Sequence, residues 1–217
     1  MNSFNNILNN DFSPNECLGV VLAGGLSSRM GQDKAKLLRN TTDMLNFSKQ
    51  LLVNSGINNL VVSGDEYDIP DKVKKSGPVG GIYSVLSRFP QAKALLILPV
   101  DLPFMTPKIL ADLRIKGELN QKATYFKDHN IPLYLPNNTY IELFLSKTFY
   151  NNSLVSNELS GSGKVLGKIS KKNGPSIKAL LQHIPHQEIQ CGDSKALFNT
   201  NTPEQWQQAK NSLVFKR

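Results

Sequence analysis

Two short apolar segments place the strongest constraint on what this chain of 217 residues can fold into. The first, Leu18–Leu22, carries apolar side chains around one glycine and runs toward Gly24 and Gly25, and the second, Ala94–Leu98, is apolar throughout. Short apolar runs are typical of strands covered on both faces, as in parallel sheets between helices. Apolar strands alternate here with segments of helical spacing, which indicates an α/β fold. We predict one doubly wound (Rossmann-like) domain with a mostly parallel mixed sheet, and expect ligands at the carboxyl ends of its strands.

The other strands and the domain limits follow from the same patterns. Leu60–Ser63 predicts a strand, and the alternating segments Ala123–Phe126 and Ile131–Leu135 predict a strand pair. The polar, asparagine-rich residues 1–15 predict a flexible lead-in. A single domain is therefore expected over residues 16–217.

Helix limits are predicted from capping residues, proline and glycine. One helix is expected to begin near Asp43, capped by Thr41 or Thr42, and to stop at Gly56. The glycine-, serine- and lysine-rich residues 157–173 predict a mobile loop. Further helices are expected at Ile82–Ser87, Pro107–Ile115, Tyr140–Phe149, Ser176–His183 and from Pro203 onward.

The chain is basic, with a net charge of +8 and a pI near 9.4. Such a charge suits a nucleic-acid partner, but it equally suits an enzyme that handles polyanionic small molecules. The lysines and arginines are scattered, and few aromatic residues lie among them, which argues against single-stranded nucleic acid. We therefore expect no nucleic-acid partner.

Cysteine use and hydropathy predict the compartment. Cys17 and Cys191 are far apart and neither lies in a C-x-x-C motif, so reduced thiols in a cytoplasmic protein are expected. No apolar run approaches membrane-spanning length, and residues 1–15 lack the features of a secretory signal. The prediction is a cytoplasmic protein without a membrane partner.

The segment that follows the first apolar run predicts an anion-binding loop. Gly24 and Gly25 allow main-chain groups to approach a ligand, and Arg29 and Lys34 add positive charge within the next nine residues. A nucleoside triphosphate needs both features. The alternative is a tight turn without a ligand, and the segment matches neither of the common phosphate-loop motifs.

An acidic residue follows the second apolar run. Asp101 lies within Pro99–Pro103, at the same predicted sheet edge as the glycine loop. A carboxylate there is suited to Mg²⁺, which prefers carboxylate and phosphate oxygens. The alternative is a turn or helix-capping aspartate before Pro103.

Two further segments carry residue types suited to ligand binding. Gly77–Ile82 combines glycines with an expected helix N-terminus, which offers N–H donors to anions. Asn199 and Asn201 stand at alternate positions, so both can point the same way from an extended segment. The alternative is that the asparagines only cap the helix that starts at Pro203.

Together these segments resemble the signatures of molybdenum cofactor guanylyltransferases, within the larger nucleotidyltransferase group. Leu22–Ala35 fills every specified position of L-A-G-G-x-S-x-R-M-G-x-D-K-A. Pro99–Pro103 matches P-x-D-x-P, Gly77–Ile82 is similar to G-P-L-x-G-I with Val79 for leucine, and Asn199–Glu204 is similar to N-x-N-T-P-E. The resemblance implies a nucleotidyltransferase fold that transfers GMP from GTP to the phosphate of molybdopterin and releases pyrophosphate.

The resemblance also implies roles for individual residues. Asp101 is expected to bind Mg²⁺, while Arg29 and Lys34 neutralise the phosphates; these three form the implied catalytic group. The implied nucleotide-binding residues are Leu22, Ala23, Gly24, Gly25, Lys34, Ser63, Asp71 and Asp101, and the implied substrate-binding residues are Gly77, Pro78, Gly80, Gly81, Asn199 and Asn201.

The nucleotide contacts after the second strand carry alternatives. Ser63 stands where the family often has asparagine, and it is a shorter hydrogen-bonding residue. Asp71 is placed by its distance from the Gly77–Ile82 motif, with Asp65, Glu66 and Asp68 as competitors.

The acceptor side departs further from the family. The family usually carries His-Pro-Leu in the strand pair, whereas this chain has Ile131–Leu133 with His129 displaced by two residues. Recognition of the pterin is therefore expected to differ. Val100 stands where the family commonly has a cysteine. His183 and His186 are expected at the surface.

The expected partners are GTP and molybdopterin as substrates, with transient contact to molybdoenzyme maturation proteins. A related enzyme using CTP or UTP on a pterin, sugar or polyol phosphate is the first alternative. Many such enzymes carry L-A-A-G where this chain has Leu22–Gly25. A non-catalytic module that binds nucleotide or RNA is the second alternative.

Overall fold

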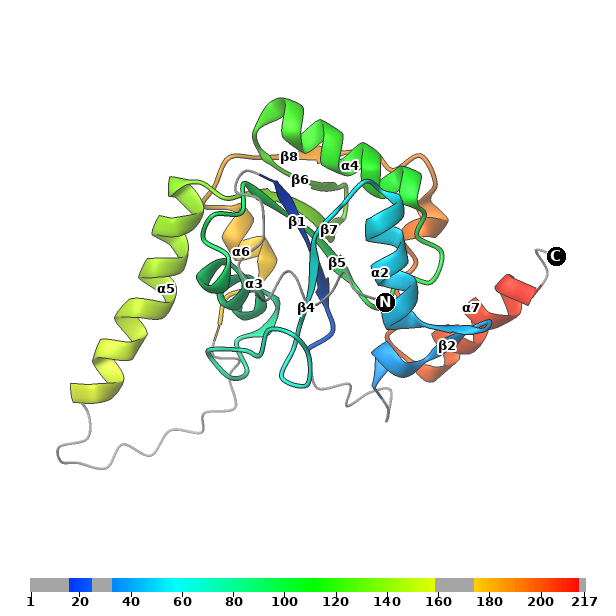
Figure 1. Ribbon diagram of the computed structural model, residues 1–217, viewed down its shortest axis with the longest axis horizontal. Coiled ribbons are helices and arrows are strands. Elements are labelled where there is room, and N and C mark those ends of the chain that lie inside the picture. The colour runs from blue at the N-terminus through cyan, green and yellow to red at the C-terminus, as the bar shows by residue number, and fades with distance from the viewer. Residues whose placement is uncertain (1–15, 25–32, 159–173, 215–217) are drawn as a thin grey trace.

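A six-stranded sheet forms the centre of the protein (Figure 1). The computed structural model describes residues 16–24, 33–158 and 174–214. Within these ranges, the side chains of residues 150–158 and 214 are not described. The order of the strands is β4-β1-β5-β7-β6-β8. Their bounds are β1 Cys17–Leu22, β4 Leu60–Ser63, β5 Ala94–Pro99, β6 Ala123–Phe126, β7 His129–Pro136 and β8 His186–Ile189.

Strand directions place the functional edge. β1 pairs in parallel with both β4 and β5, and β6 pairs in parallel with β8. β7 runs antiparallel to its neighbours β5 and β6. The carboxyl ends of five strands and the amino end of β7 therefore meet at one edge. This confirms the predicted mostly parallel mixed sheet.

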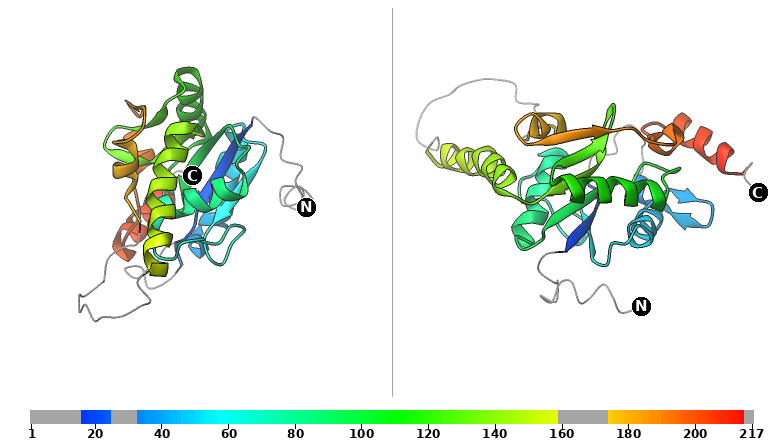
Figure 2. Two further views of the ribbon diagram at one scale, coloured as in Figure 1. Left: turned by 90° about the vertical axis from the view of Figure 1, so that its left-hand side faces the viewer. Right: turned by 90° about the horizontal axis from the view of Figure 1, so that it is seen from above.

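Helices cover both faces of the sheet (Figures 1 and 2). Alternate residues of β1 show why, because Leu18 and Val20 are buried in one apolar core and Val21 in the other. Strands apolar at every position can satisfy two covered faces at once. The helices over the first core are α3 Gly77–Arg88, α5 Thr139–Glu158 and α6 Ile177–Leu181, and those over the second are α2 Met44–Asn54 and α4 Pro107–Asn120.

Several helix limits differ from the prediction. The N-cap of α2 is Asp43, whose carboxylate accepts from Asn46 N at 2.7 Å, so neither Thr41 nor Thr42 caps it. Thr42–Asp43 instead forms the short strand β3, paired with β2 Leu38–Arg39.

The glycine motif before α3 is also different from the expected loop. Gly77 is the first residue of α3, so the motif forms the first turns of the helix. β8 was not predicted, because its exposed, polar residues give no apolar pattern. His186 is the first residue of this strand. His183 and His186 are both exposed, which confirms the predicted surface position of the two histidines.

The C-terminal segment returns to the functional edge. After β8 it forms the 3-10 turn η2 Ser194–Leu197 and then α7 Pro203–Val214. Trp206 of α7 is buried against Leu37 and Met44, so the helix packs beside the β2–β3 hairpin (Figure 1). This packing fixes the residues between η2 and α7.

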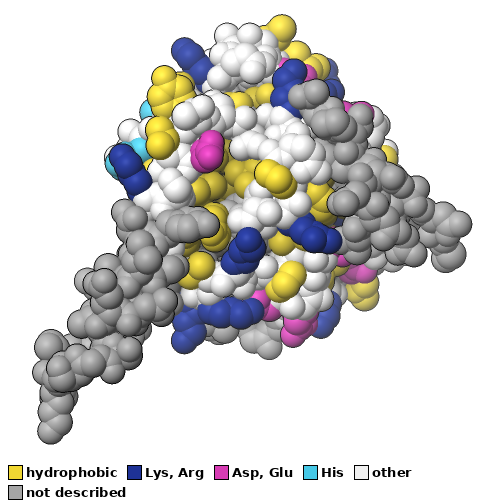
Figure 3. Space-filling view, turned by 60° about the vertical axis from the view of Figure 1, so that its left-hand side comes forward, with side chains coloured by type: hydrophobic (Ala, Val, Ile, Leu, Met, Phe, Trp, Pro, Cys, Tyr) yellow, Lys and Arg dark blue, Asp and Glu magenta, His cyan; other side chains and the backbone are white. Residues whose placement is uncertain are grey.

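The surface charges, the hydropathy of the helices and the cysteines can be examined directly. On the face shown in Figure 3, lysine and arginine side chains lie at several separate places. Within the described residues, no helix has the length and apolar character needed to cross a membrane. Cys17 and Cys191 form no disulfide, and burial raises the pKa of Cys17 to about 12. The Cys17 thiol is therefore protonated and unreactive at neutral pH.

Candidate active site

Three predicted site residues meet at the carboxyl edge of the sheet. Lys34 lies in the 3-10 turn η1 Lys34–Lys36, Asp101 lies two residues after β5, and Asn201 lies just before α7. Lys34 Nζ donates to Asp101 Oδ2 at 2.8 Å and to Asn201 Oδ1 at 2.8 Å. Only 16% of the Lys34 side chain and 14% of the Asp101 side chain are exposed. One cation thus bridges an acid and an amide that lie far away in the sequence.

The second carboxylate oxygen of Asp101 is left for another partner. Asp101 Oδ1 is buried and receives no hydrogen bond from any described residue. A buried carboxylate oxygen in this state is costly unless a cation or donor binds it. Nowhere in the described part of the chain do three His, Cys, Asp or Glu side chains cluster as a metal site. A hard cation at Oδ1 would therefore take its remaining oxygens from amide side chains, a bound ligand or water.

The main chain of Asp101 is tied to the asparagine segment. Thr200 donates to the Asp101 carbonyl from its amide at 3.0 Å and from its hydroxyl at 3.2 Å. The Gln205 side chain accepts from Asn201 N at 2.7 Å and from Thr202 N at 3.1 Å. These bonds hold Asn201 in place beside Lys34.

Asn199 provides a second buried oxygen at this edge. Its Oδ1 has no hydrogen-bond partner among the described residues. A role limited to capping α7 would leave this atom unexplained, because buried polar atoms are normally paired. Asn199 and Asn201 therefore both belong to the candidate site.

The ends of β1 and β4 form a close main-chain contact. The amides of Ala23 and Gly24 both donate to the Ser63 carbonyl at 3.0 Å. Gly64 has a positive φ of 152°, and a Cβ there would lie 2.9 Å from Gly24 N. Sequence reasoning missed Gly64, and its signal was its position directly after a predicted strand. This contact requires glycine because any side chain would collide with the main chain of Gly24, just after β1.

Ser63, Asp71 and Gly81 come together at the first turns of α3. A Cβ on Gly81 would lie 2.7 Å from Ser63 Oγ and 3.8 Å from Asp71 Oδ1. Burial raises the pKa of Asp71, the Asp65 charge raises it further, and Lys74 opposes both. Asp71 is therefore a half-buried acid that faces the end of β4.

The competitors of Asp71 are engaged elsewhere. Asp65 forms an ion pair with Lys74, and exposed Glu66 lies 3.9 Å from Lys36. The Asp68 carboxylate accepts from Val62 N at 2.8 Å, which makes it part of the turn after β4. Only Asp71 of the four borders both Ser63 and Gly81.

The glycines of the α3 motif have different surroundings. Gly80 is buried, and a Cβ there would lie 1.6 Å from Ser76 Oγ, so this glycine leaves room for the N-cap side chain of its own helix. Gly77 has open space around its Cβ position and a φ of +67°, and Pro78 is exposed. The contacts predicted for Gly77, Pro78, Gly80 and Gly81 with substrate stay predictions.

The entry to Lys34 is fixed by Asp33, which the signature includes but for which the sequence analysis gave no role. Asp33 accepts from Ala35 N at 2.9 Å and from the Tyr67 hydroxyl at 2.9 Å. Burial and the Asp33 bond raise the pKa of Tyr67 to about 12, so this phenol stays a donor. Two predicted residues, Gly25 and Arg29, lie outside the described residues, as does most of the expected mobile loop.

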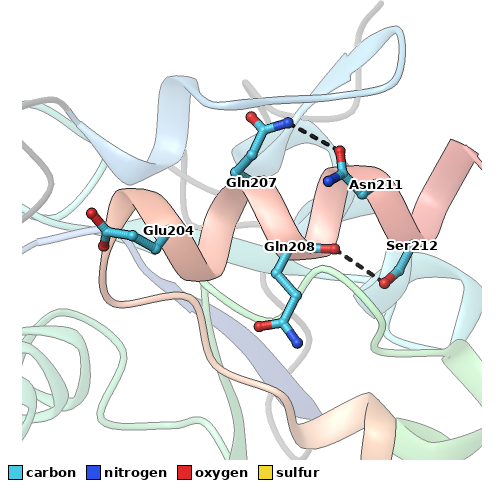
Figure 4. Close-up of a pocket in the computed structure, with 5 residues that line it drawn as sticks. All are labelled: Glu204, Gln207, Gln208, Asn211 and Ser212. Atoms are coloured by element: carbon cyan, nitrogen blue, oxygen red, sulfur yellow. Dashed lines mark hydrogen bonds between the residues drawn. The ribbon is translucent and has the colours of Figure 1, made fainter.

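Two surface hollows border the C-terminal segment. One, of about 560 Å³, is lined on α7 by Glu204, Gln207, Gln208, Asn211 and Ser212 (Figure 4). Gln207 bonds Asn211 at 3.0 Å, and this hollow holds none of the predicted site residues. The second hollow, of about 420 Å³, is lined by Phe104, His129, Ser194, Lys195, Leu197, Phe198, Gln208 and Ser212.

The sheet and its edge define a nucleotidyltransferase of the Rossmann-like class. The family described as "MobA-like NTP transferase domain" matches residues 19–143, which is more than half of the chain. The protein therefore belongs to the MobA-like NTP transferase family.

Two relatives of this chain share one name. The molybdenum cofactor guanylyltransferase of Xanthomonas euvesicatoria is 32% identical over 87% of this chain and 91% of its own. That of Campylobacter jejuni is 27% identical over 92% of this chain and 98% of its own. A solved structure, molybdopterin-guanine dinucleotide biosynthesis protein A from Archaeoglobus fulgidus, has the same fold, with a TM-score of 0.66 at 19% identity over 91% and 99% of the two chains.

Proposed function

We propose that this protein transfers GMP from GTP to the phosphate of molybdopterin, forming the guanine dinucleotide cofactor and pyrophosphate. The observation that carries the proposal is the Lys34–Asp101–Asn201 network, with the Asp101 Oδ1 atom buried and without a partner among the described residues. It stands at the sheet edge where the strand order of a doubly wound fold opens a ligand crevice. Family membership and the names of the relatives support the same reaction.

The residues suit a phosphate-on-phosphate transfer. An acceptor phosphate oxygen attacks the α-phosphorus in line, and pyrophosphate leaves with the developing charge. Such a step needs positioning and positive charge rather than a covalent enzyme intermediate. Lys34 supplies a fixed cation at the edge, and Arg29 is proposed to add a second one. No general base is required, because the acceptor phosphate is already largely ionised near neutral pH.

We propose that Asp101 holds Mg²⁺ through Oδ1. Lys34 occupies Oδ2, so Oδ1 is the atom open to a cation. The fit is good because a hard cation prefers a carboxylate oxygen together with phosphate oxygens. When bound at Asp101, the metal would act as a Lewis acid and offset the negative charge of the phosphates.

The main chain at the end of β1 suits guanine. The amides of Ala23 and Gly24 are already bonded to Ser63, so this segment can offer a base chiefly carbonyl oxygens. Carbonyls accept from the N1–H and 2-amino groups of guanine. We propose that Leu22, Ala23, Gly24 and Gly25 border the base, with Ser63 and Asp71 beside the nucleoside.

A nucleotide panel tests the proposal. The purified protein is mixed with Mg²⁺, molybdopterin and GTP, CTP, UTP or ATP in turn, and pyrophosphate release is measured. We expect release with GTP far above release with the other three nucleotides. Preferred use of CTP or UTP would overturn the choice of guanine in favour of the related cytidylyl- or uridylyltransferase.

The non-catalytic alternative makes a different prediction. A module that only binds nucleotide or RNA would release no pyrophosphate with any nucleotide, and its RNA affinity would fall steeply with salt. The same preparation therefore separates the two classes of protein.

A further inference from the structure

Lys34 belongs to an element that cannot fix its position alone. It is the first residue of η1, a 3-10 turn of three residues. So short a turn has little stability of its own, and the lysine side chain is a flexible stem. Its Nζ atom nevertheless lies 2.8 Å from Asp101 Oδ2 and 2.8 Å from Asn201 Oδ1. Contacts of η1 and its flanks with other elements must therefore place this cation.

The chain that follows η1 is anchored to the loop that carries Asp101. Arg39 Nε donates to the Pro103 carbonyl at 2.7 Å. The Arg39 guanidinium also lies 4.0 Å from the centre of the Phe47 ring on α2, which orients it. These contacts fix the end of the segment that follows Lys34.

The end that precedes Lys34 is anchored by Tyr67, in the turn after β4. The Tyr67 hydroxyl donates to Asp33 Oδ2 at 2.9 Å, and Asp33 Oδ1 accepts from Ala35 N at 2.9 Å. One carboxylate thus joins η1, which it caps, to the turn after β4. Hydrogen bonds to carboxylates are stronger than those between neutral groups. Lys36 Nζ lies 3.7 Å from the same carboxylate, but its side chain is 72% exposed, so it adds little.

Tyr67 is itself fixed beside the end of β1. Its amide donates to the Gly64 carbonyl at 3.0 Å, and a Cβ on Gly64 would lie 2.9 Å from its ring. Gly64 in turn packs on Gly24. Burial and the Asp33 bond raise the pKa of Tyr67 to about 12, so its hydroxyl stays a donor at neutral pH. One side chain therefore connects the main chain proposed to border the base with the turn that carries Lys34.

We propose that Tyr67 is a positioning residue for the transfer reaction, which holds Lys34 through Asp33 at the place where this cation meets Asp101. This inference rests on the proposed function, because Lys34 is the cation of that same site. Without the Tyr67 hydroxyl, Asp33 keeps only its bond within η1, and the turn is free to move with Lys34. Tyr67 thus acts on the reaction through the lysine and not through contact with substrate.

Tyr67→Phe tests the proposal, because it removes only the hydroxyl and keeps the ring that packs on Gly64. Loss of a hydrogen bond to a carboxylate should lower kcat for pyrophosphate release about tenfold, with the GTP KM changed less than about threefold. Tyr125→Phe is the matched control, since the Tyr125 hydroxyl donates to Glu188 at 3.2 Å, between β6 and β8. The control should keep the wild-type kcat. Thermal unfolding of each variant verifies that it is folded.

The Lys34→Met background separates positioning from a general loss of stability. If Tyr67 acts through Lys34, adding Tyr67→Phe to Lys34→Met should lower the remaining kcat less than about twofold. A bond that only stabilises the fold would give the same relative change in both backgrounds. Asp33→Asn provides a second variant, because it leaves one acceptor oxygen for the two donors, and it should lower kcat as Tyr67→Phe does.

A labelling experiment tests the contact without turnover. Lysines are acetylated with acetic anhydride, and the rate at each lysine is measured by mass spectrometry. Lys34, with 16% of its side chain exposed, is compared with Lys116, which pairs with Asp112 on α4. Tyr67→Phe should raise the rate at Lys34 about fivefold and leave the rate at Lys116 unchanged.

The outcomes separate this inference from the proposed function. Unchanged kcat in the folded Tyr67→Phe variant, an equal relative decrease in the Lys34→Met background, or unchanged labelling of Lys34 would each overturn the inference while the reaction itself stands. If the wild-type protein releases no pyrophosphate, the proposed function fails. In that case an increase in labelling confined to Lys34 still supports Tyr67 as the residue that holds this lysine, and no increase overturns it.

Discussion

The two halves of the functional edge are built in different ways. On the β4–β1 side, main chain packs on main chain, as in the contact of Gly64 with Gly24 and the two amides that share the Ser63 carbonyl. On the β5–β7 side, side chains from separate elements line a hollow, with Phe104 and Phe198 as its aromatic walls. Asp101 and Lys34 stand between them.

This contrast bears on tolerance to change. A close main-chain contact accepts no added atom, because backbone cannot move aside as a side chain can. A side-chain hollow can change shape by exchange of one lining residue. The β4–β1 side is therefore expected to tolerate few substitutions, and the β5–β7 side is expected to tolerate more exchanges of side chains.

The largest expected effect comes from the residue shared by both halves. Asp101→Asn removes the charge proposed to hold the metal, and pyrophosphate release should fall by about 10²–10³-fold. The fold should persist, since Thr200 binds the main chain of residue 101. Asp112→Asn, at an exposed ion pair on α4, is the matched control and should keep its activity. Wild-type turnover in Asp101→Asn would refute the metal assignment.

The rigidity of the β4–β1 side can be tested with one methyl group. Gly64→Ala would bring a Cβ within 2.9 Å of Gly24 N at a positive φ, so we expect a loss of about 1–3 kcal/mol in the free energy of unfolding, measured by urea denaturation. Gly192→Ala, with no atom within 4 Å, should unfold like the wild-type protein. If the Gly64→Ala and Gly192→Ala variants had equal free energies of unfolding, the close main-chain contact on the β4–β1 side would not restrict substitution as argued above.

A smaller effect is expected at the bridge between the halves. Asn201→Ala removes one acceptor of Lys34 and leaves its bond to Asp101, so kcat should fall about tenfold. Asn211→Ala, farther along α7, serves as the control and should match the wild-type rate. If both variants were equally active, Asn201 would be only a capping residue.

The smallest effect is a pH dependence of stability on the β4 side. Because the pKa of Asp71 is raised, the folded chain holds its proton more tightly than the unfolded chain, and stability falls as pH rises through that pKa. Asp71→Asn should therefore melt slightly higher than the wild-type protein at neutral pH. The difference should vanish toward the acid side, where Asp71 is protonated in both states.

Asp65→Asn is the opposite-sign control for this measurement. The bond with Lys74 lowers the pKa of Asp65, so its charge favours the folded chain above that pKa. The variant should melt slightly lower at neutral pH. A shift of the same sign in both variants would contradict the assigned surroundings of these two acids.

The sequence predicted the sheet well because burial imposes an unbroken apolar pattern. Leu60–Ser63 is a strand at the predicted limits, and Ala94–Leu98 is extended only by Pro99. β8 escaped prediction because a half-exposed strand with polar residues looks like a loop. The cap of α2 was assigned to a threonine because Asp43 itself was taken as the first helical residue.

The same distinction applies to the site. Lys34, Asp101 and Asn201 were predicted from linear motifs, and the sheet brings them within hydrogen-bond distance across separations of 67 and 167 residues. The Tyr67 bond to Asp33 and the hollow at Phe104 and Phe198 were not predicted. Contacts between side chains of separate elements depend on register and packing, which leave no local pattern.

The Thr200 bonds to the Asp101 carbonyl have a consequence for synthesis. The donor follows the acceptor by 99 residues, and α7 follows Thr200 almost at once. During synthesis, 99 more residues must be added after Asp101 before its carbonyl oxygen can receive the hydrogen bonds from Thr200. We expect catalytic competence to arise only after Thr200 has been synthesised and folded against Asp101, so shorter products would carry the strands without a complete site.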